Sequence, residues 1–224
     1  MKRNIWLTLF SIALIANIVT AKLQDPIFRY IAKPLLMLFL LVWFISQTNR
    51  INSSLRKWII SALLFSWAGD VLLMFEPEDK IFFMLGLSAF LLAHIFYIVF
   101  FHQVRVREAV KGNPWLMVLV VVYYGALITF LSPHLGDLKW PVRVYGIVIS
   151  FMFMLAMHML FIKNKAAGVF MMIGALLFVV SDSVLAIDKF YQHFDAAGII
   201  IITYCLGQFS IVNGAIKYLR SDNN

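Results

Sequence analysis

The sequence predicts an all-α protein, a polytopic membrane bundle of eight transmembrane helices, and two observations support this. Of its 224 residues, 62% are hydrophobic and 13% are charged, whereas about a quarter of the residues of a soluble domain are charged. The apolar residues also form long blocks, and roughly 20 residues of helix cross the hydrocarbon core of a bilayer. We therefore expect residues 1–224 to form a single transmembrane domain of an integral multi-pass membrane protein.

Eight apolar blocks mark the expected helices. Each connection between consecutive blocks contains Lys or Arg, and these residues favour the ends of a membrane-spanning helix. In chain order the blocks are Asn4–Thr20 after Lys2 and Arg3, Ile31–Thr48 before Arg50, Trp58–Phe75 after Lys57, Ile81–Phe101 after Lys80, Trp115–Leu131 after Lys111, Val142–Ile162 before Lys163, Ala166–Ile187 after Lys165, and Ala196–Ile216 before Lys217.

The first block has a second interpretation. Lys2 and Arg3 precede it and Val19-Thr20-Ala21 ends it, a pattern that also resembles a cleavable signal peptide. Because seven further blocks follow, we expect it to be retained as a span.

Both termini are expected in the cytoplasm, because this orientation satisfies the positive-inside rule. It places twelve Lys and Arg residues inside and seven outside. The seven are Lys22, Arg29, Lys33, Lys80, Lys139, Arg143 and Lys189.

The two halves of the chain, residues 1–112 and 113–224, resemble each other weakly. A shift of 112 residues superposes Asp70 on Asp182, Leu73 on Leu185, Phe82 on Phe194, and Gly86 on Gly198. Because each half contains an even number of spans, the repeats would be parallel.

The net charge of +8 would favour nucleic acid as the partner of a soluble protein. Here the basic residues lie in loops and tails, so the lipid bilayer with its anionic headgroups is the expected partner and nucleic acid is not. The single cysteine, Cys205, lies in an apolar block and is interpreted as a packing residue.

Asp70 and Asp182 are the first candidates for function. Of the eleven acidic residues, only these two fall inside expected spans, where an ionisable group costs several kcal/mol unless it faces water or a partner. Each lies six residues before an acidic residue that marks the outer end of its helix, so both are expected roughly 9 Å below the outer surface. Two carboxyl groups in one apolar pocket should share a proton, as general acid and base catalysis requires.

Two other interpretations of the aspartates stay open. Each could hydrogen-bond a neighbouring span as a structural residue. Alternatively, the pair could bind a proton or cation in a membrane transporter, which would place the same residues at the same depth.

Other polar residues in the spans are candidates for binding substrate near the aspartates. Ser66 lies one turn below Asp70, and Ser181 adjoins Asp182. His94 and Tyr97 share one helical face, as do Tyr204 and Gln208. For each of these, a hydrogen bond to another helix is the structural alternative.

Lys33, at the outer entrance to the second span, lies where a lipid phosphate would lie. No spacing of His and carboxylate residues resembles a zinc site such as H-E-x-x-H, so no metal and no other cofactor is expected. Gly-x-Ser-x-Gly is also absent, which disfavours a serine hydrolase.

Four segments together resemble the YhhN-like lysoplasmalogenase family, and the resemblance covers most of the chain. The segments are Lys33-Pro34-Leu35, Ser66-Trp67-Ala68-Gly69-Asp70, the run from Gly86 to Tyr97 that contains Ala93-His94, and Ser181-Asp182-Ser183-Val184-Leu185-Ala186, followed by Thr203-Tyr204 and Gln208. Cys205 stands where the family pattern has a second tyrosine, and Gly207 replaces a small alanine.

The resemblance implies an integral membrane hydrolase that cleaves the sn-1 vinyl ether bond of a lysoplasmalogen, a lysophospholipid, to a fatty aldehyde and glycerophosphocholine or glycerophosphoethanolamine. A vinyl ether is hydrolysed by protonation of carbon and capture of the resulting oxocarbenium ion by water. A carboxylic acid and an ionised neighbour can divide these tasks, as paired carboxylates do in glycosidases.

Overall fold

The computed structural model describes residues 5–23, 26–76, 78–79, 81–194 and 196–222. Within these residues the chain is helical and has no strand, which confirms the predicted all-α class. The eight helices are α1 (Ile5–Leu23), α2 (Pro26–Thr48), α3 (Arg56–Met74), α4 (Ile81–Arg107), α5 (Pro114–Leu131), α6 (Lys139–His158), α7 (Lys165–Phe190) and α8 (Ala197–Asp222). Three single 3-10 turns, Ser132–His134, Gly136–Leu138 and Met159–Phe161, lie in the connections.

Seven of these helices contain stretches that are long and apolar enough to cross a membrane. The described apolar stretch of the remaining helix, Ile5–Thr20 in α1, is shorter. A count of eight spans and the cytoplasmic position of both termini therefore stay predictions. Of the residues that bear on orientation, Lys2, Arg3 and Lys80 and the side chains of Lys22 and Arg29 lie outside the described residues.

The helix ends differ from the predicted blocks for identifiable reasons. Helix α2 begins at Pro26 and α5 at Pro114, since proline has the backbone angle of a first turn and no N–H to satisfy there. The Asn113 side chain then caps α5 by accepting a hydrogen bond from the Trp115 N–H at 3.0 Å. Helices α4 and α8 continue beyond their apolar blocks to Arg107 and Asp222, because the Lys and Arg residues that follow these blocks are good helix formers.

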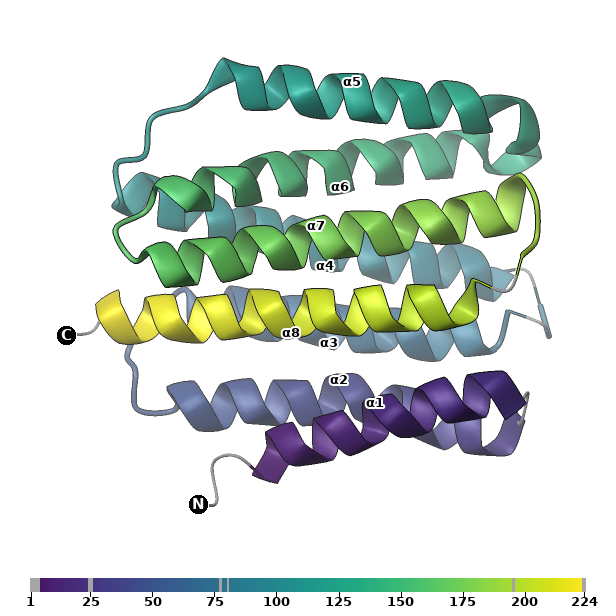
Figure 1. The fold of residues 1–224 in the computed structure, drawn as a ribbon, viewed down its shortest axis with the longest axis horizontal. Coiled ribbons are helices and arrows are strands. Elements are labelled where there is room, and N and C mark those ends of the chain that lie inside the picture. The colour runs from purple at the N-terminus through teal and green to yellow at the C-terminus, as the bar shows by residue number, and fades with distance from the viewer. Residues whose placement is uncertain (1–4, 24–25, 77, 80, 195, 223–224) are drawn as a thin grey trace.

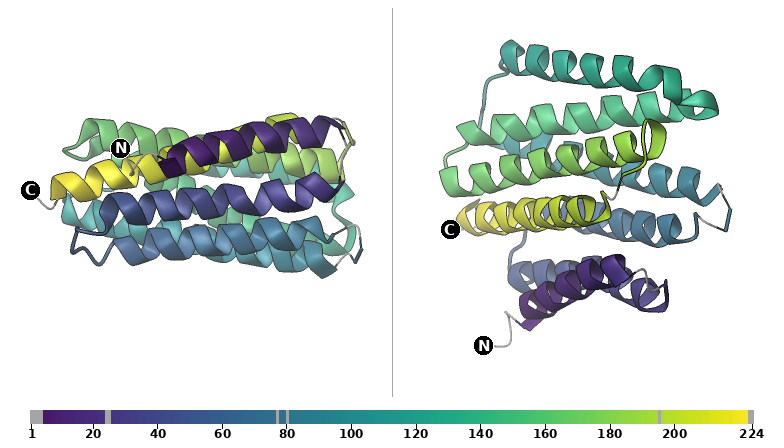
Figure 2. Two further views of the ribbon diagram at one scale, coloured as in Figure 1. Left: turned by 90° about the horizontal axis from the view of Figure 1, so that it is seen from below. Right: turned by 45° about the vertical axis from the view of Figure 1, so that its right-hand side comes forward.

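The helices lie side by side with their axes roughly aligned, and each runs opposite to the one before it (Figures 1 and 2). The start of α1 and the end of α8 therefore point to the same end of the bundle (Figure 1). We call the opposite end, where α1, α3, α5 and α7 finish, the distal end. Helix α5 lies at one edge of the bundle, with only Val120 and Leu131 buried.

Helices α7 and α8 form the tightest contact. A Cβ atom added at Gly174 would lie 2.6 Å from the carbonyl oxygen of Gly207, and one at Gly214 would lie 2.8 Å from the carbonyl oxygen of Ala167. Small residues therefore let the two backbones touch, as is common where helices pack in membranes. This contact fixes α7, which carries Asp182, against α8, which carries Tyr204.

Helices α3 and α4 pack in a similar way beside Asp70. A Cβ atom at Gly69 would lie 2.6 Å from the ring of Phe90, so glycine leaves the space that this ring fills. Shifted by 112 residues, α3 falls within α7, and the eight helices divide into two corresponding groups of four. The parallel repeat itself stays a prediction.

Candidate active site

A cavity of about 610 Å³ lies near the distal end of the bundle. Residues from α1, α2, α3, α4, α6, α7 and α8 line it, so segments far apart in the chain meet there. Much of its wall is apolar, including Leu73, Phe83, Leu87, Phe90, Leu185 and Phe190. A concave, mostly apolar space of this size with a few polar groups is typical of a site for a small molecule.

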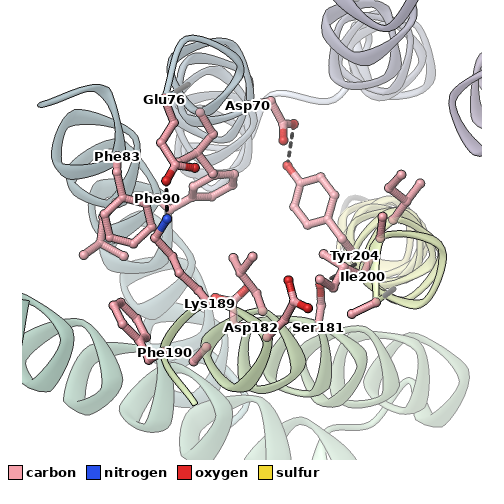
Figure 3. A pocket seen from close by; sticks show the side chains of 18 of the residues that line it. Asp70, Glu76, Phe83, Phe90, Ser181, Asp182, Lys189, Phe190, Ile200 and Tyr204 are labelled. Atoms are coloured by element: carbon pink, nitrogen blue, oxygen red, sulfur yellow. Dashed lines mark hydrogen bonds and ion pairs between the residues drawn. The ribbon is translucent and has the colours of Figure 1, made fainter. Parts of the chain in front are cut away.

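Asp70 lies on the cavity wall, near the distal end of α3 (Figure 3). It is only 3% exposed. Its Oδ2 atom accepts a hydrogen bond from the Tyr204 hydroxyl at 2.8 Å, and its Oδ1 atom is 3.9 Å from Nζ of Lys33. The buried Asp70 carboxyl group thus has a hydrogen-bond donor from α8 and a cation from α2 beside it.

Asp182 lies on the same cavity wall, on α7 (Figure 3). Its Oδ2 atom accepts a hydrogen bond from the hydroxyl of Tyr145 on α6. In the described part of the chain no cation lies within ion-pair distance of Asp182. The two aspartates therefore have matching tyrosine partners and different charged surroundings.

Asp70 and Asp182, which the sequence predicts to meet at one site, both line this cavity. The structure does not show the two carboxyl groups sharing a proton directly. Among the described residues, each carboxyl group accepts a hydrogen bond from its own tyrosine, and no hydrogen bond joins the two. The hydroxyl groups of Tyr204 on α8 and Tyr145 on α6 each occupy one oxygen of these carboxyl groups.

Three of the predicted substrate-binding residues also line this cavity: Lys33, Ser181 and Tyr204. The Ser181 hydroxyl is turned to the backbone and donates to the Ile200 carbonyl at 3.1 Å, which ties α7 to the start of α8. Tyr204 is held by its hydrogen bond to Asp70, and its ring packs edge-on against Phe90 and Phe178.

The structure places Ser66, Tyr97 and Gln208 beneath the cavity instead of on its described wall. They form one buried hydrogen-bonded chain that joins α3, α4 and α8. The Tyr97 hydroxyl donates to Oε1 of Gln208 at 2.5 Å, and Nε2 of Gln208 donates to the Ser66 hydroxyl at 2.9 Å. Each polar side-chain atom of these three residues thus has a hydrogen-bond partner within the protein.

His94 is also buried away from the described cavity wall. Its ring packs edge-on against Phe178 and Tyr145, with ring centroids 4.7 and 5.3 Å apart. The Phe90 carbonyl, one turn earlier, interacts with the ring, but neither ring nitrogen forms a well-aligned hydrogen bond within the described residues. The position of His94 therefore supports Tyr145, which holds Asp182.

The sequence interpretation missed Tyr145 and an ion pair between Glu76 and Lys189. This pair crosses the cavity at the distal end and joins α7 to the end of α3 (Figure 3). The ammonium group of Lys189 also lies 4.2 Å from the centre of the Phe83 ring. A tyrosine in an apolar span gives a weak sequence signal, and both charged residues resemble ordinary helix ends.

Comparison with known proteins identifies relatives of the chain. The sequence profile of the YhhN family matches residues 28–215. A lysoplasmalogenase of Mycobacterium bovis is 33% identical over 138 residues, which is 60% of this chain and 51% of that protein. Human lysoplasmalogenase TMEM86B is 30% identical over 186 residues, or 82% of this chain and 73% of that protein. Bovine lysoplasmalogenase TMEM86A is 32% identical over 168 residues, or 71% and 65% respectively.

The chain spans about half the length of the mycobacterial relative. No solved structure matches the chain significantly. The apolar helices and the family match together make it an integral multi-pass membrane protein.

Proposed function

The chain belongs to the YhhN family, and from this premise we propose that it is a lysoplasmalogenase. The proposed reaction cleaves the sn-1 vinyl ether bond of a lysoplasmalogen with water, releasing a fatty aldehyde and a glycerophospho-headgroup. Relatives from bacteria and mammals carry the name lysoplasmalogenase, which supports the assignment. The observation that carries the chemistry is that Asp70 and Asp182 line one mostly apolar cavity.

The different surroundings of the two aspartates support different roles for them in the proposed reaction. Lys33, 3.9 Å from Asp70, stabilises a carboxylate there by charge attraction. Asp182 accepts a hydrogen bond from neutral Tyr145 and has no cation at ion-pair distance in the described residues. We therefore assign Asp182 as the general acid and Asp70 as the carboxylate that stabilises the cation and activates water.

The proposed reaction returns both acids to their starting states. Asp182 gives its proton to the vinyl carbon that is not bonded to oxygen. This forms an oxocarbenium ion beside the Asp70 carboxylate. Water adds to the cationic carbon and passes a proton to Asp70, giving a hemiacetal. Asp182 then removes the hemiacetal hydroxyl proton while Asp70 protonates the departing glycerol oxygen, and the carbon–oxygen bond breaks to release the aldehyde.

The cavity wall supports a placement for the rest of the substrate. Apolar residues such as Leu73, Phe90 and Leu185 suit the alkenyl chain. Lys33 lies on the wall beside Asp70, where we propose that it also meets the substrate phosphate. Ser181 and Tyr204 complete the polar side of the cavity. The buried residues Ser66, His94, Tyr97 and Gln208 are proposed to hold the helices that carry the acids.

A direct test is aldehyde release by the purified protein in detergent. Lysoplasmalogen with a choline or ethanolamine headgroup is the substrate, and the saturated alkyl-ether analogue is the control because it has no vinyl group to protonate. We expect aldehyde from the first and none from the second, with no ion gradient present. Activity that appeared only as ion or solute movement across sealed vesicles would favour the transporter instead.

A further inference from the structure

Asn17, on α1, has a buried side-chain amide whose hydrogen-bonding groups are unused. The residue is 1% exposed. Neither the amide nitrogen nor the amide oxygen has a hydrogen-bond partner in the described part of the chain. Buried amides are nearly always paired, so an unpaired one marks a place where a bound molecule can supply the partner.

The position of Asn17 connects this amide to the candidate active site. Of the buried side chains without a hydrogen-bond partner among the described residues, Asn17 is the one that lines the 610 Å³ cavity. It lies six residues before the end of α1 at Leu23, while Asp70 and Asp182 lie four and eight residues before the ends of α3 and α7. All three are thus about 6 to 12 Å from the distal helix ends, the level at which the proposed reaction takes place.

The chemistry of the amide limits which group of the substrate it can bind. A primary amide offers donors and an acceptor without charge, so its natural partner is a group that also both donates and accepts, such as a hydroxyl. In a lysoplasmalogen the phosphate and the ammonium group are charged, and the alkenyl chain is apolar. The free sn-2 hydroxyl is neutral, both donates and accepts, and is attached to the carbon next to the one that bears the vinyl ether.

We propose that Asn17 binds the free sn-2 hydroxyl of the substrate and is a specificity-determining residue for the lyso form. The inference rests on the substrate class of the proposed function. An acyl group at the sn-2 oxygen removes the hydroxyl proton and leaves the Asn17 oxygen unpaired in a buried site. A site built to hydrogen-bond a hydroxyl rejects analogues that lack it, because its own polar groups then stay unpaired.

The test compares two pairs of ligands on wild type and Asn17→Leu, in detergent. One pair is lysoplasmalogen and its 2-deoxy analogue, for aldehyde release. The other is the saturated alkyl-ether lysolipid and its 2-deoxy analogue, for binding without turnover by tryptophan fluorescence. Leucine has a similar branched shape and removes the unpaired polar atoms, so the fold should tolerate it. Ser11→Ala, at an exposed position of the same helix, is the control.

We expect wild type and Ser11→Ala to prefer the hydroxyl-bearing ligand by about ten- to a hundredfold, and Asn17→Leu to lose this preference. A wild type that shows no preference overturns the inference, as does an Asn17→Leu variant that keeps it. Asn17→Ala provides the same comparison if the leucine variant does not fold.

The two readouts separate this inference from the proposed function. Hydroxyl-dependent binding that requires Asn17, without aldehyde release, would contradict the enzymatic assignment and leave the hydroxyl site standing. Aldehyde release that does not depend on the sn-2 hydroxyl would support the enzymatic assignment and contradict the hydroxyl site.

Discussion

The Tyr204 hydroxyl donates a hydrogen bond to Asp70 at 2.8 Å, across 134 residues of the chain. Asp182 has a corresponding tyrosine partner, Tyr145, from α6. Each acid is thus oriented by a phenol from a neighbouring helix. Both acids line the cavity, and no hydrogen bond joins them among the described residues.

Replacing Tyr204 with phenylalanine should lower turnover and leave the fold intact. The substitution removes the donor to Asp70 and keeps the ring that packs on Phe90 and Phe178. We expect kcat for aldehyde release to fall by roughly 10- to 150-fold, since one hydrogen bond to a charged group contributes about 1.5–3 kcal/mol. Tyr218→Phe, near the opposite end of α8, should leave kcat unchanged. Equal kcat for wild type and Tyr204→Phe would contradict the orienting role.

Lys33→Met should weaken binding of the intact lysolipid more than it slows turnover. The variant removes a cation that lies on the cavity wall and beside Asp70. We expect KM for lysoplasmalogen to rise by about tenfold, as loss of a charge-assisted contact predicts. An alkenylglycerol without phosphate should show a much smaller rise in KM. Equal losses on both substrates, confined to kcat, would mean that Lys33 acts on Asp70 alone.

Tyr97→Phe distinguishes a supporting residue from a substrate contact. The Tyr97 hydroxyl donates to buried Gln208, and its removal leaves Oε1 of Gln208 unpaired. We expect a loss of about 1–3 kcal/mol in the free energy of unfolding in detergent and an unchanged KM. A higher KM with unchanged stability would return Tyr97 to the substrate site.

Gly174→Ala should destabilise the contact between α7 and α8. The added methyl group would lie 2.6 Å from the Gly207 carbonyl oxygen and equally close to the Ile211 nitrogen. Because both atoms belong to the backbone and cannot easily move, we expect the free energy of unfolding to fall by about 1–3 kcal/mol. Gly198→Ala is the matched control, since nothing lies within 4 Å of its added methyl group. Equal stability of the two variants would contradict the close packing of these helices.

The sequence was sufficient to predict the helical class and to single out two acids that line one cavity. Composition indicates the apolar environment, in which an ionisable residue stands out. Depth was predicted less well, because Asp70 lies four residues before the end of α3 and Asp182 eight residues before the end of α7. Spacing along one helix was less informative. Tyr204 and Gln208 are one turn apart and face the same way, yet only Tyr204 lies on the described cavity wall while Gln208 lies beneath it. Helical periodicity predicts which residues share a face of the helix, but it does not predict how far along that face the cavity extends.

The residues that were missed share a physical reason. Asn17 and Tyr145 are neutral, so each costs little inside an apolar helix and neither stands out as an ionised aspartate does. Their importance arises from neighbours on other helices, which the sequence alone does not reveal. The pairing of Glu76 with Lys189 is of the same kind, because it depends on how the ends of α3 and α7 meet.

Aldehyde release by purified wild type, Asp70→Asn and Asp182→Asn is the measurement that tests the central claim, with Asp137→Asn, in a loop at the distal end, as the control. We expect both active-site variants to keep the wild-type unfolding temperature within a few degrees and to lose at least about 100-fold in kcat, the usual contribution of a general acid or base. The control should retain full activity. Folded Asp70→Asn and Asp182→Asn proteins that each keep more than roughly a tenth of wild-type kcat would contradict catalysis by the aspartate pair.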